Sequence, residues 1–195
     1  MLYKFIIKPF LWLAYKIVFR YKFYGEENVP KDGPGIICGN HLCMCDPVSI
    51  VLAIDRLPCF IGKKELFENK LWAWLFRNLK AFPVDREKMD MKALKHAIKV
   101  LKEGELLGIF AQGTRVKEGE DVAAKAGVAL FAVKSGAPVI PVAIKSEYKL
   151  FSKVEVRFGE PISFEEYKGK KVSADELNEI ANGIMDKVYE ILGEM

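Results

Sequence analysis

Two residues capable of proton-transfer chemistry, His41 and Asp46, stand five positions apart in the first quarter of the chain. A neutral imidazole can take a proton from a hydroxyl group, and a carboxylate can orient the ring and stabilise the imidazolium that forms. A turn through the four intervening residues would let the two side chains meet. A simpler interpretation is also open, because Asp before Pro47 is a common helix cap and a lone histidine after Gly-Asn is a common loop residue.

The elements on either side decide where this pair would lie. Residues 36–38 are apolar and predict a buried strand, and residues 48–54 predict a helix that starts with Asp46 as the N-cap and Pro47 at its first position. His41 would then lie just beyond the end of a strand. In open α/β sheets, ligands bind in the crevice at the carboxyl ends of the strands.

A second polar loop, residues 112–115, follows another predicted core strand at 106–110. Gly113 permits close approach of the backbone to an anion, Thr114 adds a hydroxyl donor, and Arg115 offers a planar fork that matches phosphate oxygens. Two further basic residues follow strand-like segments and would reach the same crevice: Lys63 and Arg86. Together with the His/Asp pair, these residues predict that a phosphate-bearing compound is held while its hydroxyl is deprotonated.

The rest of the chain alternates between helices and strands. Further strands are expected at 21–24, 59–62, 82–86, 139–144 and 154–158, and further helices at 9–20, 65–79, 90–103, 122–135 and, after a capping box at 173–176, to the C-terminus. This alternation predicts one α/β domain with a mostly parallel central sheet flanked by helices. At 195 residues, with 51% hydrophobic residues, the chain is long enough to bury a substantial core.

The net charge of +4 comes from the N-terminus. Residues 1–24 carry five basic residues and no acid, which leaves 25 basic against 26 acidic residues elsewhere and gives no indication of a nucleic-acid partner. Four of those cations lie on one i, i+4 row of the predicted first helix: Lys4, Lys8, Lys16 and Arg20. A basic, aromatic, amphipathic helix is typical of attachment to anionic lipid headgroups, although a helix packed on the domain with solvated lysines is the alternative.

We therefore divide the chain into a membrane-associating segment, residues 1–24, and a domain, residues 25–195. No segment approaches the roughly 20 apolar residues that span a bilayer, and the first 24 residues lack the features of a signal peptide. We expect peripheral attachment to the cytoplasmic face of a membrane.

The four cysteines do not have the spacing of a secreted disulfide framework, which favours reduced thiols. A zinc site from His41, Cys43, Cys45 and Asp46 is less favoured, because paired ligand spacings are missing.

Four blocks, in order, resemble a known family. Asn40-His41, four residues and Asp46-Pro47 resemble the N-H-x-x-x-x-D motif of glycerolipid acyltransferases, in particular 1-acylglycerol-3-phosphate acyltransferases. Residues 82–86 (FPVDR) resemble the second block, residues 110–115 (FAQGTR) the third, and residues 139–143 (VIPVA) the fourth. The resemblance covers about residues 25–160.

The resemblance implies transfer of a fatty acyl group from acyl-CoA or acyl-carrier protein to the free hydroxyl of lysophosphatidic acid, which gives phosphatidic acid. His41 would be the general base and Asp46 would orient it. The phosphate would be held by Arg86, Gly113, Thr114 and Arg115, with Lys63 nearby, and Asn40, Gln112 and Pro141 would support the site, Pro141 at its acyl end. The resemblance implies no metal and no cofactor beyond the acyl donor.

The third block departs from the family pattern. Ala111 and Gln112 stand where the family usually has Pro and Glu, so the negative charge of that position is missing. The sequence leaves two alternatives open. One is an acyltransferase acting on glycerol-3-phosphate or another lysolipid, and the other is a non-catalytic lipid-binding protein with the same fold. A hydrolase that uses the His/Asp pair is a weaker third, because the chain has no G-x-S-x-G nucleophile motif.

Overall fold

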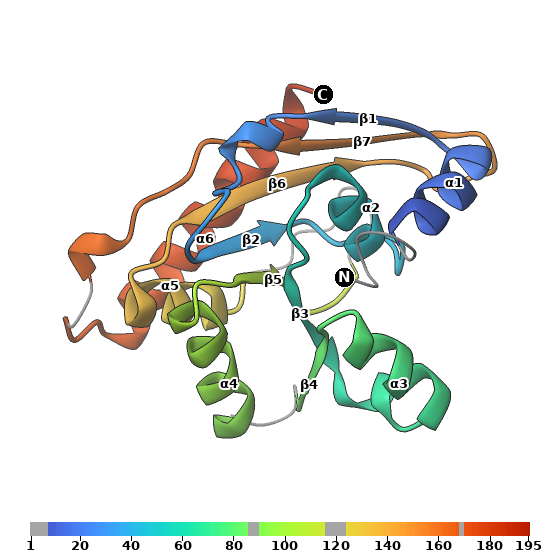
Figure 1. The fold of residues 1–195 in the computed structure, drawn as a ribbon. Helices are drawn as coiled ribbons and strands as arrows, with labels where there is room; N and C mark the ends of the chain where they lie inside the picture. The colour runs from blue at the N-terminus through green and yellow to red at the C-terminus, as the bar shows by residue number, and fades with distance from the viewer. Residues whose placement is uncertain (1–7, 86–89, 116–123, 168–169) are drawn as a thin grey trace.

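A computed structural model describes residues 8–85, 90–115, 124–167 and 170–195 (Figure 1). Arg86, expected in the phosphate site, lies outside these residues. The strands are β1 (Arg20–Tyr24), β2 (Gly35–Gly39), β3 (Cys59–Lys63), β4 (Phe82–Val84), β5 (Leu106–Phe110), β6 (Val139–Lys145) and β7 (Lys153–Phe158). The α-helices are α1 (Lys8–Val18), α2 (Asp46–Ala53), α3 (Lys70–Asn78), α4 (Met91–Lys102), α5 (Gly127–Ser135) and α6 (Ala174–Gly193).

All seven strands form one sheet in the order β1-β7-β6-β2-β5-β3-β4. Neighbouring strands run parallel except for β6 and β7, which are antiparallel. The predicted α/β domain with a mostly parallel sheet is therefore confirmed. The central strands β2 and β6 are buried almost throughout, which explains why both are continuous apolar runs in the sequence.

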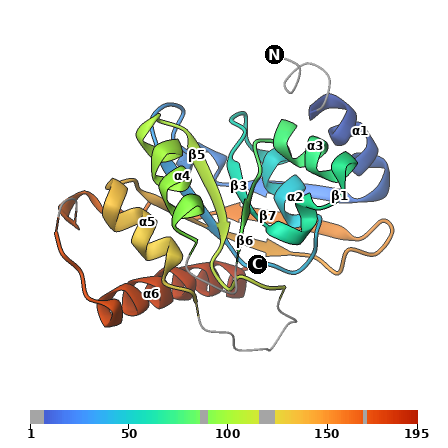
Figure 2. The ribbon, with the colours of Figure 1, turned by 90° about the horizontal axis from the view of Figure 1, so that it is seen from below.

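Helices cover both faces of the sheet and divide the core into two clusters. α4, α5 and α6 pack on one face around Val100, Val128 and Ile184, and α2 packs on the other around Ile50 and Val51. Figure 2 shows α6 running along the first face, with α1, α2 and α3 gathered on the opposite side. The loop that carries His41 leaves the end of β2 and enters α2, so the candidate site lies on the α2 side of the sheet.

Two of the predicted helix starts are wrong in detail. The residue before α2 is Cys45, and Asp46 is already the first helical residue, with its side chain bonded elsewhere. The expected helix 65–79 is split into a short 3₁₀ turn, Lys64–Phe67, and α3. The split occurs at Asn69, whose side-chain oxygen accepts hydrogen bonds from Leu71 N and Trp72 N and so caps a new helix.

Of the predicted cationic row, Lys4 lies outside the described residues, Lys8 and Lys16 lie on α1, and Arg20 does not lie on the helix. Lys8 Nζ donates to Ile54 O at 2.7 Å and pairs with Asp55, so it ties α1 to the C-terminal end of α2. Arg20 lies in β1, where its Nε donates to a backbone carbonyl, and Lys16 Nζ lies 4.2 Å from the centre of the Trp12 ring. β1, predicted at 21–24, lies at one edge of the sheet. Within the described residues, no helix has the length and apolar character needed to cross a bilayer.

Candidate active site

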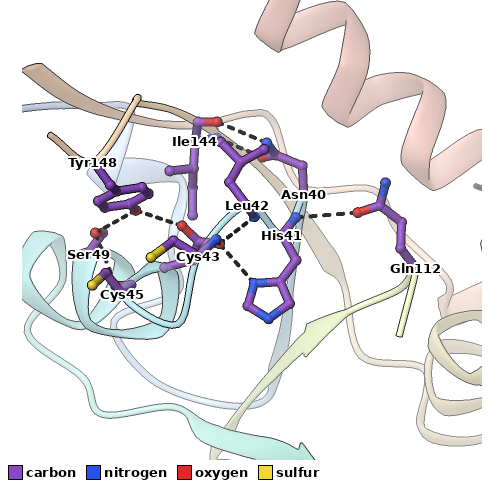
Figure 3. Close-up of polar contacts among 10 residues, drawn as sticks. Asn40, His41, Leu42, Cys43, Cys45, Ser49, Gln112, Ile144 and Tyr148 are labelled. Atoms are coloured by element: carbon purple, nitrogen blue, oxygen red, sulfur yellow. Dashed lines mark hydrogen bonds and ion pairs between the residues drawn. The ribbon is translucent and has the colours of Figure 1, made fainter. Parts of the chain in front are cut away.

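The structure brings His41 and Asp46 into direct contact at the end of β2. His41 Nδ1 lies 2.8 Å from Asp46 Oδ2, while the carboxylate is buried and the ring keeps a small exposed area (Figure 3). Because the carboxylate accepts at Nδ1, the neutral ring carries its hydrogen there and leaves the lone pair of Nε2 available. This arrangement prepares the imidazole to act as a base at Nε2.

Asp46 does not cap α2, contrary to the prediction. Its Oδ2 accepts hydrogen bonds from Leu42 N at 2.6 Å and Cys43 N at 2.8 Å, so the side chain turns back into the loop that precedes the helix. Its Oδ1 accepts a hydrogen bond from the hydroxyl of Tyr148 at 2.6 Å. The carboxylate therefore holds the loop closed around His41 instead of capping the helix.

The ring of His41 is fixed on its face as well as at its edge. It stacks on Phe110, the last residue of β5, with 4.2 Å between ring centres and 16° between planes. β5 is the direct neighbour of β2 in the sheet, which explains how a residue 69 positions later reaches the ring. An ordinary core phenylalanine could not be assigned this role from sequence.

Asn40 anchors the start of the loop. Its Nδ2 donates to Ile144 O at 2.9 Å, and its Oδ1 accepts from Ile144 N at 2.8 Å. The side chain thus continues the pairing of β2 with β6 beyond the strand, in a fully buried setting. Asn40 supports the site by fixing the loop, and both hydrogen-bonding ends of its amide are used for that.

Gln112 joins the two loops. Its Oε1 accepts from His41 N at 3.3 Å, and its Nε2 donates to the hydroxyl of Tyr189 on α6 at 2.6 Å. The side chain is 2% exposed, so these contacts account for a buried amide. At the position where the resembling family usually has a glutamate, this chain uses an uncharged bridge between the His41 loop and the C-terminal helix.

The loop of the third block, residues 112–115, runs from the buried Gln112 to the protein surface. Gly113 has a φ of +68° and its N–H donates to Phe110 O at 3.0 Å, which turns the chain sharply after β5. Thr114 and Arg115 are exposed. The structure adds Lys125, whose side chain lies over Gly113 so closely that a Cβ there would meet Lys125 Cε at 2.9 Å.

Lys63 and Pro141 lie in different surroundings. Lys63 ends β3, is about half exposed, and has its Nζ 3.5 Å from Glu65 Oε1. Pro141 is buried in β6 opposite Cys38, where its carbonyl accepts from Gly159 N at 2.8 Å. Lys63 lines the cavity described next, and Pro141 does not.

An apolar cavity of about 150 Å³ opens beside His41. It is enclosed by α1, α2, β3, the 3₁₀ turn after β3, and α3. Its lining includes His41, Met44, Val48, Leu66, Phe76 and Phe110. The imidazole of His41 therefore forms part of the wall of an apolar cavity.

The cysteines are free and two of them are buried in the core. Burial raises the pKa of Cys38 to about 12 and that of Cys59 to about 11, so neither thiol is ionised near neutral pH. Burial also raises the pKa of Cys45, in the His41 loop. Among the described residues, no three His, Cys, Asp or Glu side chains are grouped to hold a metal ion, and the zinc alternative gains no support.

A partly buried loop histidine is paired with a buried carboxylate, next to an apolar cavity and a basic loop on a mostly parallel α/β sheet, an arrangement capable of acid–base chemistry. The acyltransferase family model matches residues 20–145, and the chain belongs to this family. It is 38% identical over 149 residues to the 1-acyl-sn-glycerol-3-phosphate acyltransferase of Bacillus subtilis, covering 72% of this chain and 73% of that protein.

Two further relatives agree with this assignment. The Streptococcus pneumoniae protein of the same name is 30% identical over 177 residues, which cover 87% of this chain and 65% of that protein. The crystal structure of the 1-acyl-sn-glycerophosphate (LPA) acyltransferase of Thermotoga maritima superposes with a TM-score of 0.74 at 27% identity. That match covers 97% of this chain and 78% of the other.

Proposed function

We propose that this protein transfers a fatty acyl group from a thioester, either acyl-CoA or acyl-carrier protein, to the free hydroxyl of lysophosphatidic acid. The observation that carries the proposal is the contact of His41 Nδ1 with the buried Asp46, beside an apolar cavity and a basic loop. Relatives with this activity in their names cover most of the chain. The product, phosphatidic acid, makes the reaction a step of phospholipid biosynthesis.

The proposed reaction needs a base, and His41 is positioned for it. Nε2 takes the proton of the acceptor hydroxyl while the oxygen attacks the thioester carbonyl carbon, and Asp46 stabilises the imidazolium. When the tetrahedral intermediate collapses, the carbon–sulfur bond breaks and the imidazolium returns the proton to the leaving thiolate. An ester and a free thiol result. The chemistry requires no metal or other cofactor.

The fatty acyl chain and the phosphate group of the substrates need different surroundings. The apolar cavity is suited to a fatty acyl chain, because each methylene buried there contributes about 0.8 kcal/mol. The phosphate would be held by Arg115 and the Gly113 loop, joined by Lys125, and Lys63 at the cavity rim adds a further positive charge. Arg86 remains a proposed phosphate ligand on the resemblance alone.

The outer face of α1 supports a proposed attachment to a membrane. Three apolar residues of this face, which we call the α1 apolar stripe, are largely exposed: Phe10 (70%), Leu13 (56%) and Ile17 (64%). Leu71 and Trp74 on α3 are exposed to a similar degree. Since α1 and α3 both contribute to the cavity wall, insertion of these faces into a lipid surface would put the cavity next to its substrates.

We therefore propose peripheral attachment, with the apolar stripe and not a row of cations as the main contact. Lys16, on α1, remains available for anionic headgroups. The reduced cysteines are consistent with the cytoplasmic side of the membrane.

The test is an acyl-transfer assay with purified protein, lysophosphatidic acid and an acyl thioester, in which free thiol and phosphatidic acid are both measured. We expect turnover by the wild type and a loss of about 10²–10⁴-fold in His41→Ala. A matched control is His96→Ala, because His96 lies on α4 against Phe82 and away from the cavity. Equal activity of the two variants would refute the proposed base.

The same assay separates the alternatives. Faster turnover with glycerol-3-phosphate or another lysolipid would change the acceptor while keeping the mechanism. Vesicle binding that survives His41→Ala, with no thiol release by either protein, would indicate a lipid-binding protein. Thiol release without any acceptor would indicate a hydrolase.

A further inference from the structure

The fourth hydrogen bond to Asp46 comes from a residue that no sequence motif includes. Tyr148 lies in the connection between β6 and β7, 102 positions from Asp46, and its hydroxyl donates to Oδ1 at 2.6 Å (Figure 3). Its backbone has a φ of +48°, an uncommon conformation for tyrosine, and its N–H donates to Ser146 Oγ at 2.9 Å. The loop is thus shaped to deliver this side chain to the carboxylate.

The two oxygens of Asp46 are not equally supported. Oδ2 interacts with His41 and accepts from two backbone N–H groups, whereas within the described part of the chain Tyr148 is the donor to Oδ1. Asp46 is completely buried, and His41 is its ion-pair partner there. Burying a carboxylate is costly unless its oxygens accept hydrogen bonds, and within the described residues the support of Oδ1 comes from this hydroxyl.

The titratable groups that face Asp46 come from three elements. His41 and Cys45 belong to its own loop, Tyr148 to the β6–β7 connection, and Tyr21 to β1. Burial and the charge of Asp46 raise the pKa of Tyr148 far above its ordinary value, so its hydroxyl keeps its proton. The hydroxyl of Tyr21 reaches Ser49 Oγ, at 3.4 Å, and not the carboxylate.

We infer that Tyr148 is a positioning residue for the proposed acyl transfer: its hydroxyl holds the Asp46 carboxylate so that Oδ2 stays directed at His41. This inference rests on the proposed function of the His41–Asp46 pair. Without the hydroxyl, Oδ1 loses its donor, and protonation of the carboxylate becomes easier. The negative charge that remains also shifts toward Oδ2, where it favours the imidazolium. Both effects make it easier to add a proton to the His41–Asp46 pair, whichever partner takes it, so both raise the pH below which activity is lost.

The test compares Tyr148→Phe with Tyr21→Phe in pH profiles of kcat/KM. We expect Tyr148→Phe to lower kcat/KM about tenfold at neutral pH and to move the acidic limb upward by about one pH unit. The KM for the lysolipid should change little. Tyr21→Phe removes a hydroxyl from the same aromatic cluster and should keep the wild-type profile. His41→Ala is measured alongside both.

A second substitution keeps the test decisive if the phenylalanine variant does not fold by circular dichroism. Incorporation of 3-fluorotyrosine at position 148 keeps the shape but makes the hydroxyl a stronger donor, so the acidic limb should move to lower pH. Coincident profiles for the wild type, Tyr148→Phe and Tyr21→Phe would overturn the inference, as would an unmoved limb with fluorotyrosine. An inactive His41→Ala supports the proposed function whether or not the Tyr148 inference holds. Turnover by His41→Ala would overturn the proposed function itself.

Discussion

The amide of Gln112 offers a sharp prediction, because its two ends can be tested separately. Gln112→Leu removes the acceptor of His41 N–H and the donor to the Tyr189 hydroxyl. Tyr189 is 38% exposed, so water replaces its lost partner, and the main cost falls on the N–H of His41. The bond there is long, at 3.3 Å, which places the cost of losing its acceptor at about 1–2 kcal/mol.

That cost should lower the melting temperature by about 2–8 °C for a chain of this size. The effect on activity should be larger, because a base displaced by about 1 Å loses as much as 10²-fold in rate. We expect kcat/KM for acyl transfer to fall between tenfold and a hundredfold in Gln112→Leu, measured with the thiol-release assay and a thermal melt.

Gln112→Glu is the matched comparison. A carboxylate can accept from both His41 N–H and the Tyr189 hydroxyl, which then donates instead of accepting, so this variant should stay within a few-fold of wild-type activity. Tyr189→Phe leaves the His41 bond intact and should behave similarly. Wild-type activity in Gln112→Leu, or equal losses in the Leu and Glu variants, would refute the claim that activity depends on the hydrogen bonds of Gln112 to His41 N and Tyr189.

Three further predictions concern the thiols, the membrane and the cavity. Since the folded pKa values of Cys38 and Cys59 lie above those of unfolded thiols, the free energy of unfolding should fall by about 1.4 kcal/mol per thiol per pH unit from about pH 9 to 11. Cys38→Ala should flatten that slope in chemical denaturation. Serine at all three positions of the α1 apolar stripe should weaken binding to anionic vesicles about a hundredfold, unlike Met91→Ser on α4. Val48 lines the cavity, so Val48→Phe should shorten it; kcat/KM for long acyl donors relative to short ones should fall by about fourfold for each methylene that no longer fits.

Much of the fold was predictable because its signals are local. The apolar runs of β2, β5 and β6 and the capping box at the start of α6 are each recognised from a few neighbouring residues. The split of the expected 65–79 helix was missed because the side chain of Asn69 competed successfully with a helical pattern that continued through it.

For the site, the sequence by itself determined the candidate residues: a histidine and an aspartate five positions apart at a strand end, and a glycine–threonine–arginine loop after another strand. Only the tertiary structure decided what holds them. Phe110 under the ring, Gln112 against the backbone of His41 and Tyr148 against Asp46 lie 69 to 102 positions away from their partners. The physical reason is the order of strands, which places β5 and β6 on either side of β2 and so brings their loops to one carboxyl edge. Spacing along the chain carries no trace of such contacts.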